Sequence, residues 1–131
     1  MPEQAARLFQ EPNFGFLATI MEDGSPQVSP VWVDIDIANG LVLVNSAYGR
    51  VKIKNLARDP RVAISVADRT NPYTMVTVRV VEQTTEGADS HIDLMAKKYL
   101  GADKYPFRAP GEKRVLLKIK PEKVSFTPPR H

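Results

Sequence analysis

The sequence contains no cysteine, two histidines and a single tryptophan. The absence of cysteine excludes a disulfide scaffold, a thiolate zinc site, an iron–sulfur cluster and a cysteine nucleophile. No apolar run approaches the roughly 20 residues that a membrane-spanning helix needs, so we expect no membrane span. Neither a Gly-x-Gly-x-x-Gly motif nor a P-loop is present, which argues against Rossmann-type nucleotide binding. No secretion signal is recognisable, and we therefore expect a cytoplasmic protein.

What the sequence does contain suits a single domain spanning residues 1–131, with 43% apolar and 25% charged residues. The net charge of +3 is unevenly spread. Residues 1–49 hold six acids and one base, whereas residues 50–131 hold 17 bases and nine acids. The densest basic run begins where the sign changes and contains Arg50, Lys52, Lys54, Arg58 and Arg61. This run is the first place to look for an anionic ligand.

The hydrophobic pattern alternates between strand and helix periods along the chain. Six apolar or β-rich segments and turns of the Asn-Gly type predict antiparallel strands, and three segments of helical period interrupt them. Ser90 and Asp93 form a possible capping box, and Gly101 is a candidate C-cap. Five or six antiparallel strands with short helices indicate a mainly β fold, best a small closed or split barrel. We expect helices at 2–10, 46–59 and 88–100, and strands at 14–20, 27–37, 41–45, 62–67, 73–85 and 114–126, the last interrupted by Pro121.

The helix that starts near Gly49 carries two cations in its first turn. Arg50 and Lys52 fall on opposite flanks of the apolar stripe centred on Ile53. Unpaired N–H groups and the helix dipole favour an anion there, and basic side chains at this end oppose the dipole unless an anion is present. We therefore interpret Arg50 and Lys52 as a phosphate site, with both side chains exposed when no ligand is bound. Lys54 and Arg58 are interpreted as a solvated basic face.

Several strings of this sequence resemble one family. They are PQVSPVWV (residues 26–33), LVLVNSAYGRVKIKNLARDPRVAISV (41–66), NPYTMVTVRV, KKYLG and RVLLKIKPEKV. Together they resemble the flavin and deazaflavin oxidoreductases of the split-barrel type, the superfamily of pyridoxamine 5'-phosphate oxidase. The Arg-x-Lys-x-x-Asn-Leu-x-x-Asp-Pro-Arg-Val string is most similar to the branch that uses coenzyme F420. The resemblance extends from Phe14 to Val124.

This resemblance implies a six-stranded antiparallel split β-barrel of the FMN-binding type, with a Greek-key order. It also implies a homodimer whose cofactor sites lie at the subunit interface. The implied cofactor phosphate is held by Arg50 and Lys52, with Asn45 and Ser46 nearby. The implied floor of the cofactor ring is Ser29, Pro30, Val31 and Trp32, and Tyr73 and Met75 are expected to reach the partner's cofactor.

The function implied by the resemblance is an F420-dependent oxidoreductase that transfers a hydride between the cofactor and a small conjugated organic substrate. An FMN-binding oxidoreductase is the alternative. We do not expect oxidation of pyridoxamine phosphate, since this sequence does not show the extended C-terminal segment of such oxidases. The residues single out no catalytic side chain or proton donor. The family often has a glycine in its long strand, where this chain reads Val78-Arg79-Val80-Val81.

The sequence also contains histidine and aromatic residues whose roles must be weighed. His91 and Asp93 are interpreted as a surface pair at a helix start rather than half of a metal site, because nothing else supplies ligands. Trp32 is either barrel core or a ring-stacking wall. Tyr99 and Tyr105 either pack or line the substrate entrance.

A non-catalytic barrel that binds nucleic acid through the basic run is a further alternative. Such barrels pair basic strips with exposed aromatic residues, and Tyr48 is the one aromatic close to this run.

Overall fold

A computed structural model describes the backbone of residues 1–68 and 73–127, and the side chains of residues 1–68 and 83–127. The elements are α1 (Glu3–Gln10), β1 (Phe14–Ile20), β2 (Pro26–Asp36), β3 (Leu41–Ala47), α2 (Val51–Arg58), β4 (Arg61–Ala67), β5 (Tyr73–Thr84), α3 (Ala88–Leu100) and β6 (Arg114–Phe126).

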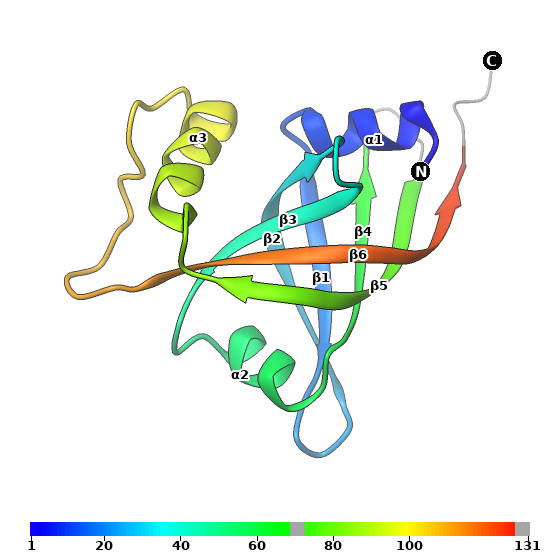
Figure 1. Cartoon of the computed structure of the whole chain (residues 1–131), viewed down its shortest axis with the longest axis horizontal. Helices are drawn as coiled ribbons and strands as arrows, with labels where there is room; N and C mark the ends of the chain where they lie inside the picture. The colour runs from blue at the N-terminus through cyan, green and yellow to red at the C-terminus, as the bar shows by residue number, and fades with distance from the viewer. Residues whose placement is uncertain (69–72, 128–131) are drawn as a thin grey trace.

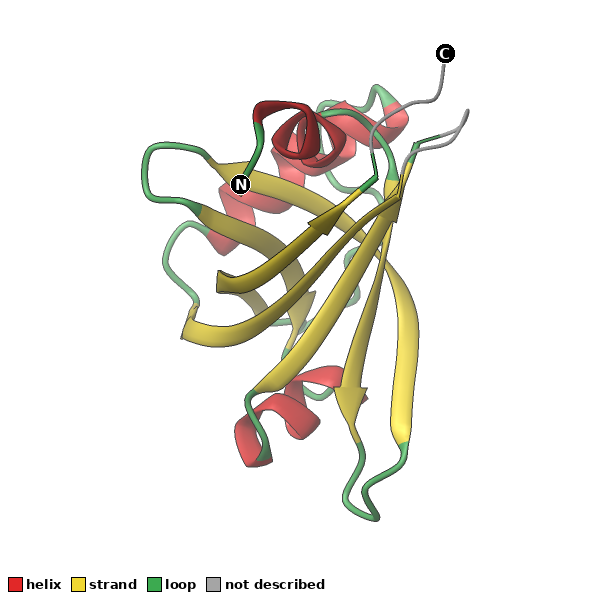
Figure 2. Ribbon diagram, turned by 90° about the vertical axis from the view of Figure 1, so that its right-hand side faces the viewer, coloured by secondary structure: helices red, strands yellow, loops and turns green. Residues whose placement is uncertain are grey.

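The six strands form a barrel in the order β1-β2-β3-β6-β5-β4, and β4 pairs with β1 to close it. Every pairing is antiparallel. Strand β3 pairs with β6 and not with β4, the next strand along the chain. Helix α2 connects β3 to β4. Helices α1 and α2 lie at opposite ends of the barrel, and α3 lies beside it (Figures 1 and 2). The predicted fold class, mainly β with antiparallel strands and short helices, is confirmed.

Three local predictions were wrong. Strand β3 continues to Ala47, so α2 begins at Val51 rather than at residue 46. The Ser90 capping box does not form, because α3 begins earlier, after Gly87 in a left-handed conformation that needs no side-chain cap. Strand β6 runs on through Pro121, where Val78 pairs with it beside a register shift in β5. A proline has no N–H to donate, and the irregular pairing accommodates it.

The barrel interior is filled by the inward-facing residues of the strands. Strand β2 shows the alternation: Val31 and Val33 are buried, whereas Pro30 and Trp32 face outward. Helix α1 closes one end with Leu8 and Phe9, and α2 contributes Ile53 and Leu56 to the same core. The burial of this continuous apolar cluster is the main term that stabilises the barrel.

One outer face of the barrel is apolar as well. Phe14 and Phe16 of β1 are 55% and 49% exposed, and Val28 of β2 is 58% exposed. In the strand register Phe16 stands opposite Pro30, and Phe14 stands opposite Trp32. We call these five residues the outer apolar face.

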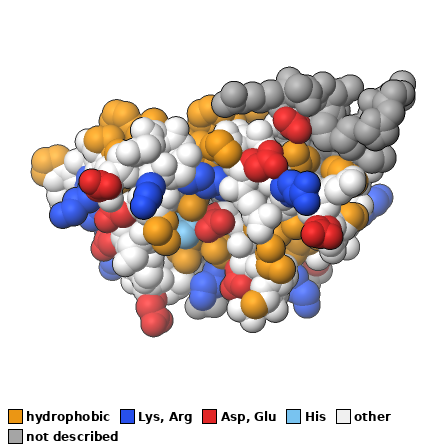
Figure 3. Space-filling view, turned by 90° about the horizontal axis from the view of Figure 1, so that it is seen from above, with side chains coloured by type: hydrophobic (Ala, Val, Ile, Leu, Met, Phe, Trp, Pro, Cys, Tyr) orange, Lys and Arg blue, Asp and Glu red, His pale blue; other side chains and the backbone are white. Residues whose placement is uncertain are grey.

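Elsewhere the surface is mixed. In the view from above, acidic and basic side chains are interspersed over the described part of the visible surface (Figure 3). Among the described residues, no helix has the length and apolar character required to cross a membrane.

Gly15 of β1 lies where the strand comes closest to the core. A Cβ at this position would lie 2.6 Å from Cγ1 of Val33 and 3.2 Å from Cδ1 of Ile64. Both neighbours are fully buried, so neither can move aside cheaply. The position therefore requires glycine for close packing of β1 against β2 and β4.

We predict that Gly15→Ala lowers the free energy of unfolding by roughly 1–3 kcal/mol, the usual cost of an overpacked core. Urea unfolding would measure the change. In the double variant Gly15→Ala with Val33→Ala, the loss should be smaller than the sum of the single losses, because removal of Val33 Cγ1 makes room for the new methyl group. A Gly15→Ala variant as stable as the wild type would contradict the packing described.

Candidate functional site

A pocket of about 180 Å³ lies outside the barrel, where β2, β3, α2, α3 and β6 meet, and it is partly open to solvent. One end is cationic and the other is aromatic. The lining residues are Phe14, Pro30, Val31, Trp32, Asn45, Ser46, Arg50, Lys52, Ile92, Tyr105, Phe107 and Arg114.

Most of the residues singled out from the sequence are brought together around this pocket: Pro30, Val31, Trp32, Asn45, Ser46, Arg50 and Lys52. Ser29 does not line it. It lies on the same face of β2 as Val31 and Val33, the face turned toward the barrel interior. The side chains of Tyr73 and Met75 lie outside the described residues, so their expected reach to a partner's cofactor stays a prediction. The side chains from Val78 to Val81, where the family often has a glycine, lie outside the described residues as well.

The cationic end is built on the start of α2. Arg50 is the N-cap residue and its side chain is 48% exposed, with Nη2 at 3.7 Å from Glu112 Oε1. Lys52 is half-buried, which corrects the expectation that both side chains are exposed. Burial first, and then the charges of Arg50 and Arg114, hold the pKa of Lys52 below its usual value. The end is thus short of negative charge, a condition that a bound anion would relieve.

Arg114 is the main pocket residue that sequence reasoning missed. It is 4% exposed, and its Nε donates to Asn45 Oδ1 at 3.0 Å. Its Nη1 lies 3.1 Å from Glu112 Oε2, and its guanidinium lies 5.0 Å from the centre of the Tyr105 ring. No sequence signal separates this arginine from a surface one, since it simply precedes an apolar strand. Glu112 therefore serves as the shared counterion of two arginines.

The aromatic end consists of rings packed on one another. Trp32 stacks on Tyr99 with ring centres 5.1 Å apart and an interplanar angle of 6°, and it meets Tyr105 edge-on. Tyr105 in turn meets Phe107 edge-on. The sequence had left Trp32 open between core and wall, and it is a half-buried wall of the pocket. Tyr105 lines the pocket as well, whereas Tyr99 packs behind Trp32.

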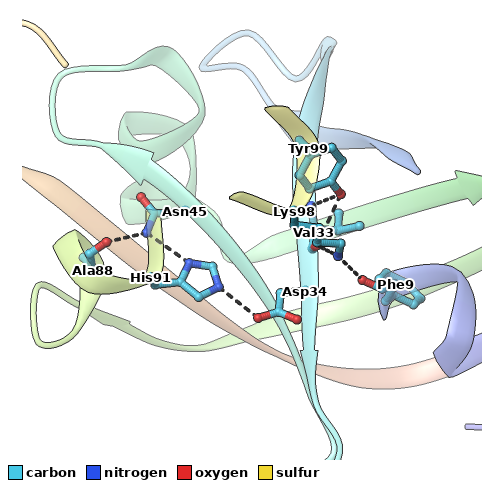
Figure 4. Close-up of polar contacts among 8 residues, drawn as sticks. All are labelled: Phe9, Val33, Asp34, Asn45, Ala88, His91, Lys98 and Tyr99. Carbon is cyan, nitrogen blue, oxygen red and sulfur yellow. Dashed lines mark hydrogen bonds and ion pairs between the residues drawn. The ribbon is translucent and has the colours of Figure 1, made fainter. Parts of the chain in front are cut away.

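His91 is not a surface residue, so that interpretation was wrong. It is 8% exposed, its Nε2 lies 3.2 Å from Asp34 Oδ2, and its Nδ1 lies 3.1 Å from Asn45 Nδ2 (Figure 4). Asp93 points elsewhere and accepts the backbone N–H of Tyr105 at 2.9 Å. Within residues 1–68 and 83–127, no three histidine or acidic side chains gather where they could hold a metal ion.

Asp34 is charged although it is partly buried. Desolvation pushes its pKa upward, but the hydrogen bond with His91, the backbone N–H of Ile35 and the nearby charge of Lys98 outweigh it. The pKa of Asp34 therefore lies below its usual value, and a carboxylate faces His91.

Lys98 and Tyr99 fasten the end of α3 to β2 (Figure 4). Lys98 Nζ donates to the carbonyls of Phe9 at 2.5 Å and Val33 at 2.6 Å. The Tyr99 hydroxyl accepts the backbone N–H of Val33 at 2.9 Å and donates to the carbonyl of Asn13 at 2.7 Å. Burial lowers the pKa of Lys98 to about 8 and raises that of Tyr99 to about 12. These contacts hold the aromatic wall in place.

The residues present fit a ligand with a phosphate and a planar ring. Among the described residues, Ser46 Oγ is buried in the pocket wall without a hydrogen-bond partner. Such an orphaned hydroxyl is costly unless a ligand oxygen pairs with it. The first turn of α2 has no acidic residue, so its N–H groups and the pocket cations suit an anion. The flat face of Trp32 suits a ring.

Comparison with known proteins identifies the family and the fold. The family model of pyridoxamine 5'-phosphate oxidase matches residues 1–128, and the chain belongs to this family. A solved F420 reductase is 27% identical, with a TM-score of 0.81, over 95% of this chain and 98% of that chain. The chain is thus a split-barrel protein of an oxidoreductase-like, flavin-binding superfamily.

Two more distant structures show the fold alone. The General Stress Protein 26 from Bacillus anthracis str. Sterne is 18% identical, with a TM-score of 0.71, over 98% of this chain and 94% of that chain. A FAD-binding protein from Mesorhizobium loti is 19% identical, with a TM-score of 0.67, over 96% of this chain and 94% of that chain.

The lowered pKa of Lys98 predicts a specific pH dependence of stability. Between about pH 8 and pH 10.5, the unfolded chain binds a proton that the folded chain has lost. Stability from this group therefore rises with pH across that window and is flat below it. Chemical unfolding at several pH values should show that the difference in unfolding free energy, wild type minus Lys98→Met, increases from about pH 8 to pH 10.5. A constant difference would show that Lys98 titrates in the folded protein as it does in the unfolded chain, and a falling difference would show that folding raises its pKa; either would contradict the prediction.

Proposed function

We propose that the protein is an F420-dependent oxidoreductase that transfers a hydride between the cofactor and a small conjugated organic substrate. The observation that carries the proposal is one pocket with a cationic end at Arg50 and Lys52 and a flat aromatic end at Trp32. The 27% identity to an F420 reductase over nearly both whole chains favours F420. FMN is the second candidate, because it too joins a phosphate to a planar ring.

The residues would divide the work of binding. Arg50, Lys52 and the N–H groups at the start of α2 would hold the phosphate, and Ser46 would donate its orphaned hydroxyl to it. Pro30, Val31 and Trp32 would form the floor under the ring. When bound, the reduced deazaflavin supplies the hydride that the substrate accepts. The chain's own contribution is to orient the ring and keep water from its covered face.

Titration with F420 and with FMN decides between the candidates. Tighter binding of F420 together with F420-dependent reduction of a conjugated test substrate supports the proposal. A yellow purified protein that releases FMN supports the alternative. Binding of neither, with a DNA or RNA affinity that falls steeply with added salt, would instead favour the nucleic-acid barrel.

We predict that the double variant Arg50→Ala with Lys52→Ala loses at least about tenfold in cofactor affinity while it stays folded, because two charge-assisted contacts to the phosphate are removed. Binding titrations and circular dichroism would measure the two effects. The double variant Lys54→Ala with Lys120→Ala is the matched control, since it removes the same charge at exposed sites outside the pocket. Equal affinities of both double variants and wild type would refute the phosphate site.

A homodimer is part of the proposal. The outer apolar face is a contiguous exposed patch on neighbouring strands, which is unusual for an isolated soluble chain. The pocket reaches the same face, since Phe14, Pro30 and Trp32 belong to both. A second copy seated on this face would cover the apolar side chains and close the open side of the pocket.

We predict that Phe16→Glu converts the protein to a monomer, because a carboxylate would be buried without a partner in the interface. Analytical ultracentrifugation would measure the change. Leu94→Glu is the control, since Leu94 is 62% exposed, lies on α3 and is not one of the five residues of the outer apolar face. A monomeric wild type, or a dimer that survives Phe16→Glu, would rule out this interface.

A further inference from the structure

A line of hydrogen bonds runs from β2 to the pocket through four side chains, three of them drawn in Figure 4. Asp34 Oδ2 lies 3.2 Å from His91 Nε2, and His91 Nδ1 lies 3.1 Å from Asn45 Nδ2. Asn45 Oδ1 accepts from Arg114 Nε at 3.0 Å. Asn45 and Arg114 line the pocket, whereas Asp34 and His91 stand behind them. Asp34 and His91 can thus act on a ligand through Asn45 and Arg114.

The neighbours of Asn45 permit one orientation of its amide. Its Nδ2 donates to the carbonyl of Ala88 at 2.8 Å, and its Oδ1 accepts from Arg114. A carbonyl oxygen can only accept and an arginine can only donate. If the amide turned over, two acceptors would face each other at Ala88 and two donors at Arg114. Both hydrogen bonds would be lost together.

This orientation also fixes the proton of His91. Asn45 Nδ2 has a second hydrogen, which points to His91 Nδ1. That nitrogen must therefore present a lone pair, so the ring proton of neutral His91 sits on Nε2 and is donated to the Asp34 carboxylate. One tautomer satisfies all four side chains.

A second proton on His91 would break the arrangement. It would place an N–H at Nδ1 against the N–H of Asn45. The amide could accept that proton only by turning over, which would release Arg114. Three charged groups lie near the ring: Asp34 on β2 contacts Nε2, Lys98 on α3 acts on Asp34, and Arg114 on β6 contacts the same Asn45 as the ring does.

We propose that Asp34 and His91 are positioning residues for the pocket. Neutral His91 fixes the Asn45 amide, and the amide holds Arg114 in the pocket wall, where it faces a phosphate-bearing ligand. The identity of that ligand rests on the proposed function, but the contacts do not. Asp34 and His91 do not touch the ligand; they determine whether Arg114 is oriented before it arrives.

The first test uses the ligand-free protein. Nitrogen NMR of the imidazole rings at about pH 7.5, where an ordinary histidine is mostly neutral, should show His91 as the Nε2–H tautomer. His131→Asn assigns the signals, because the chain has two histidines. The Nδ1–H tautomer, or a rapidly exchanging mixture of the two, would overturn the proposal.

The second test uses substitutions of His91. His91→Leu removes the acceptor and should weaken binding of F420, or of FMN if the wild type binds that instead, about tenfold, the order of one charge-assisted hydrogen bond. His91→Asn sets a carbonyl oxygen near the place of Nδ1 and should restore most of the affinity. His131→Asn is the matched control and should bind as the wild type does. Equal affinity of His91→Leu and wild type would overturn the proposal.

A pH series separates positioning from simple loss of structure. The affinity of wild type relative to His91→Asn should fall over the pH range in which NMR shows that His91 takes its second proton. The ligand's own titrations cancel in this ratio, because both proteins meet the same ligand. A ratio that does not change while His91 titrates would overturn the proposal.

A third readout needs no ligand at all. The Arg114 Nε–H signal, assigned with Arg114→Lys, should be protected from hydrogen exchange in the wild type and in His91→Asn, and should lose protection in His91→Leu. Equal protection in all three proteins would overturn the proposal. A wild type that binds neither F420 nor FMN would refute the proposed function and leave this readout intact.

Discussion

The hydrogen bond from Arg114 Nε to Asn45 Oδ1 links two barrel strands, β6 and β3, in the wall of the pocket. The two residues lie on paired strands, since Arg114 stands opposite Ala47 and Asn45 opposite Leu116, so the strand register sets their separation. A guanidinium that is 4% exposed must be paired, because an isolated buried charge is very costly. Its partners come from β3, from residue 112 and from the Tyr105 ring. Burial of this one cation therefore ties the strand ends to the 101–113 segment that covers the pocket.

The same end of the molecule concentrates positive charge. Arg50, Lys52 and Arg114 line one side of a small pocket, and Glu112 is the acidic side chain that pairs with two of them. The lowered pKa of Lys52 follows from this crowding and from its burial. Cations at the start of α2 also oppose the helix dipole. The ligand-free site is thus electrostatically unfavourable, and proteins accept such cost mainly where a ligand relieves it.

Sequence reasoning found the parts of this site that are local in the chain. Arg50 and Lys52 sit two residues apart at a helix start, so spacing alone was informative. Arg114 and His91 were missed or misplaced because their partners lie 69 and 57 residues away along the chain, and no periodicity reports such contacts. Other residues of the Arg-x-Lys string make structural contacts: buried Asn55 donates to Thr19, and Asp59 pairs with Arg61. The alternation of apolar and polar residues predicted the strands of the barrel, because each strand buries one face. The start of α2 and the N-terminal cap of α3 were predicted wrongly, because the backbone conformation of the preceding residues determines them.

Helix α3 explains why these distant groups meet. Its last turn is fastened to Val33 by Lys98 and Tyr99, and its first turns are fastened to Asp34 and Asn45 by His91. Val33 and Asp34 are consecutive residues of β2 with side chains on opposite faces, so one point of the strand holds the helix from both ends. A helix held in this way cannot slide along β2 without breaking contacts at both ends. The position of His91, and through Asn45 that of Arg114, is therefore set by the same clamp that supports the aromatic wall.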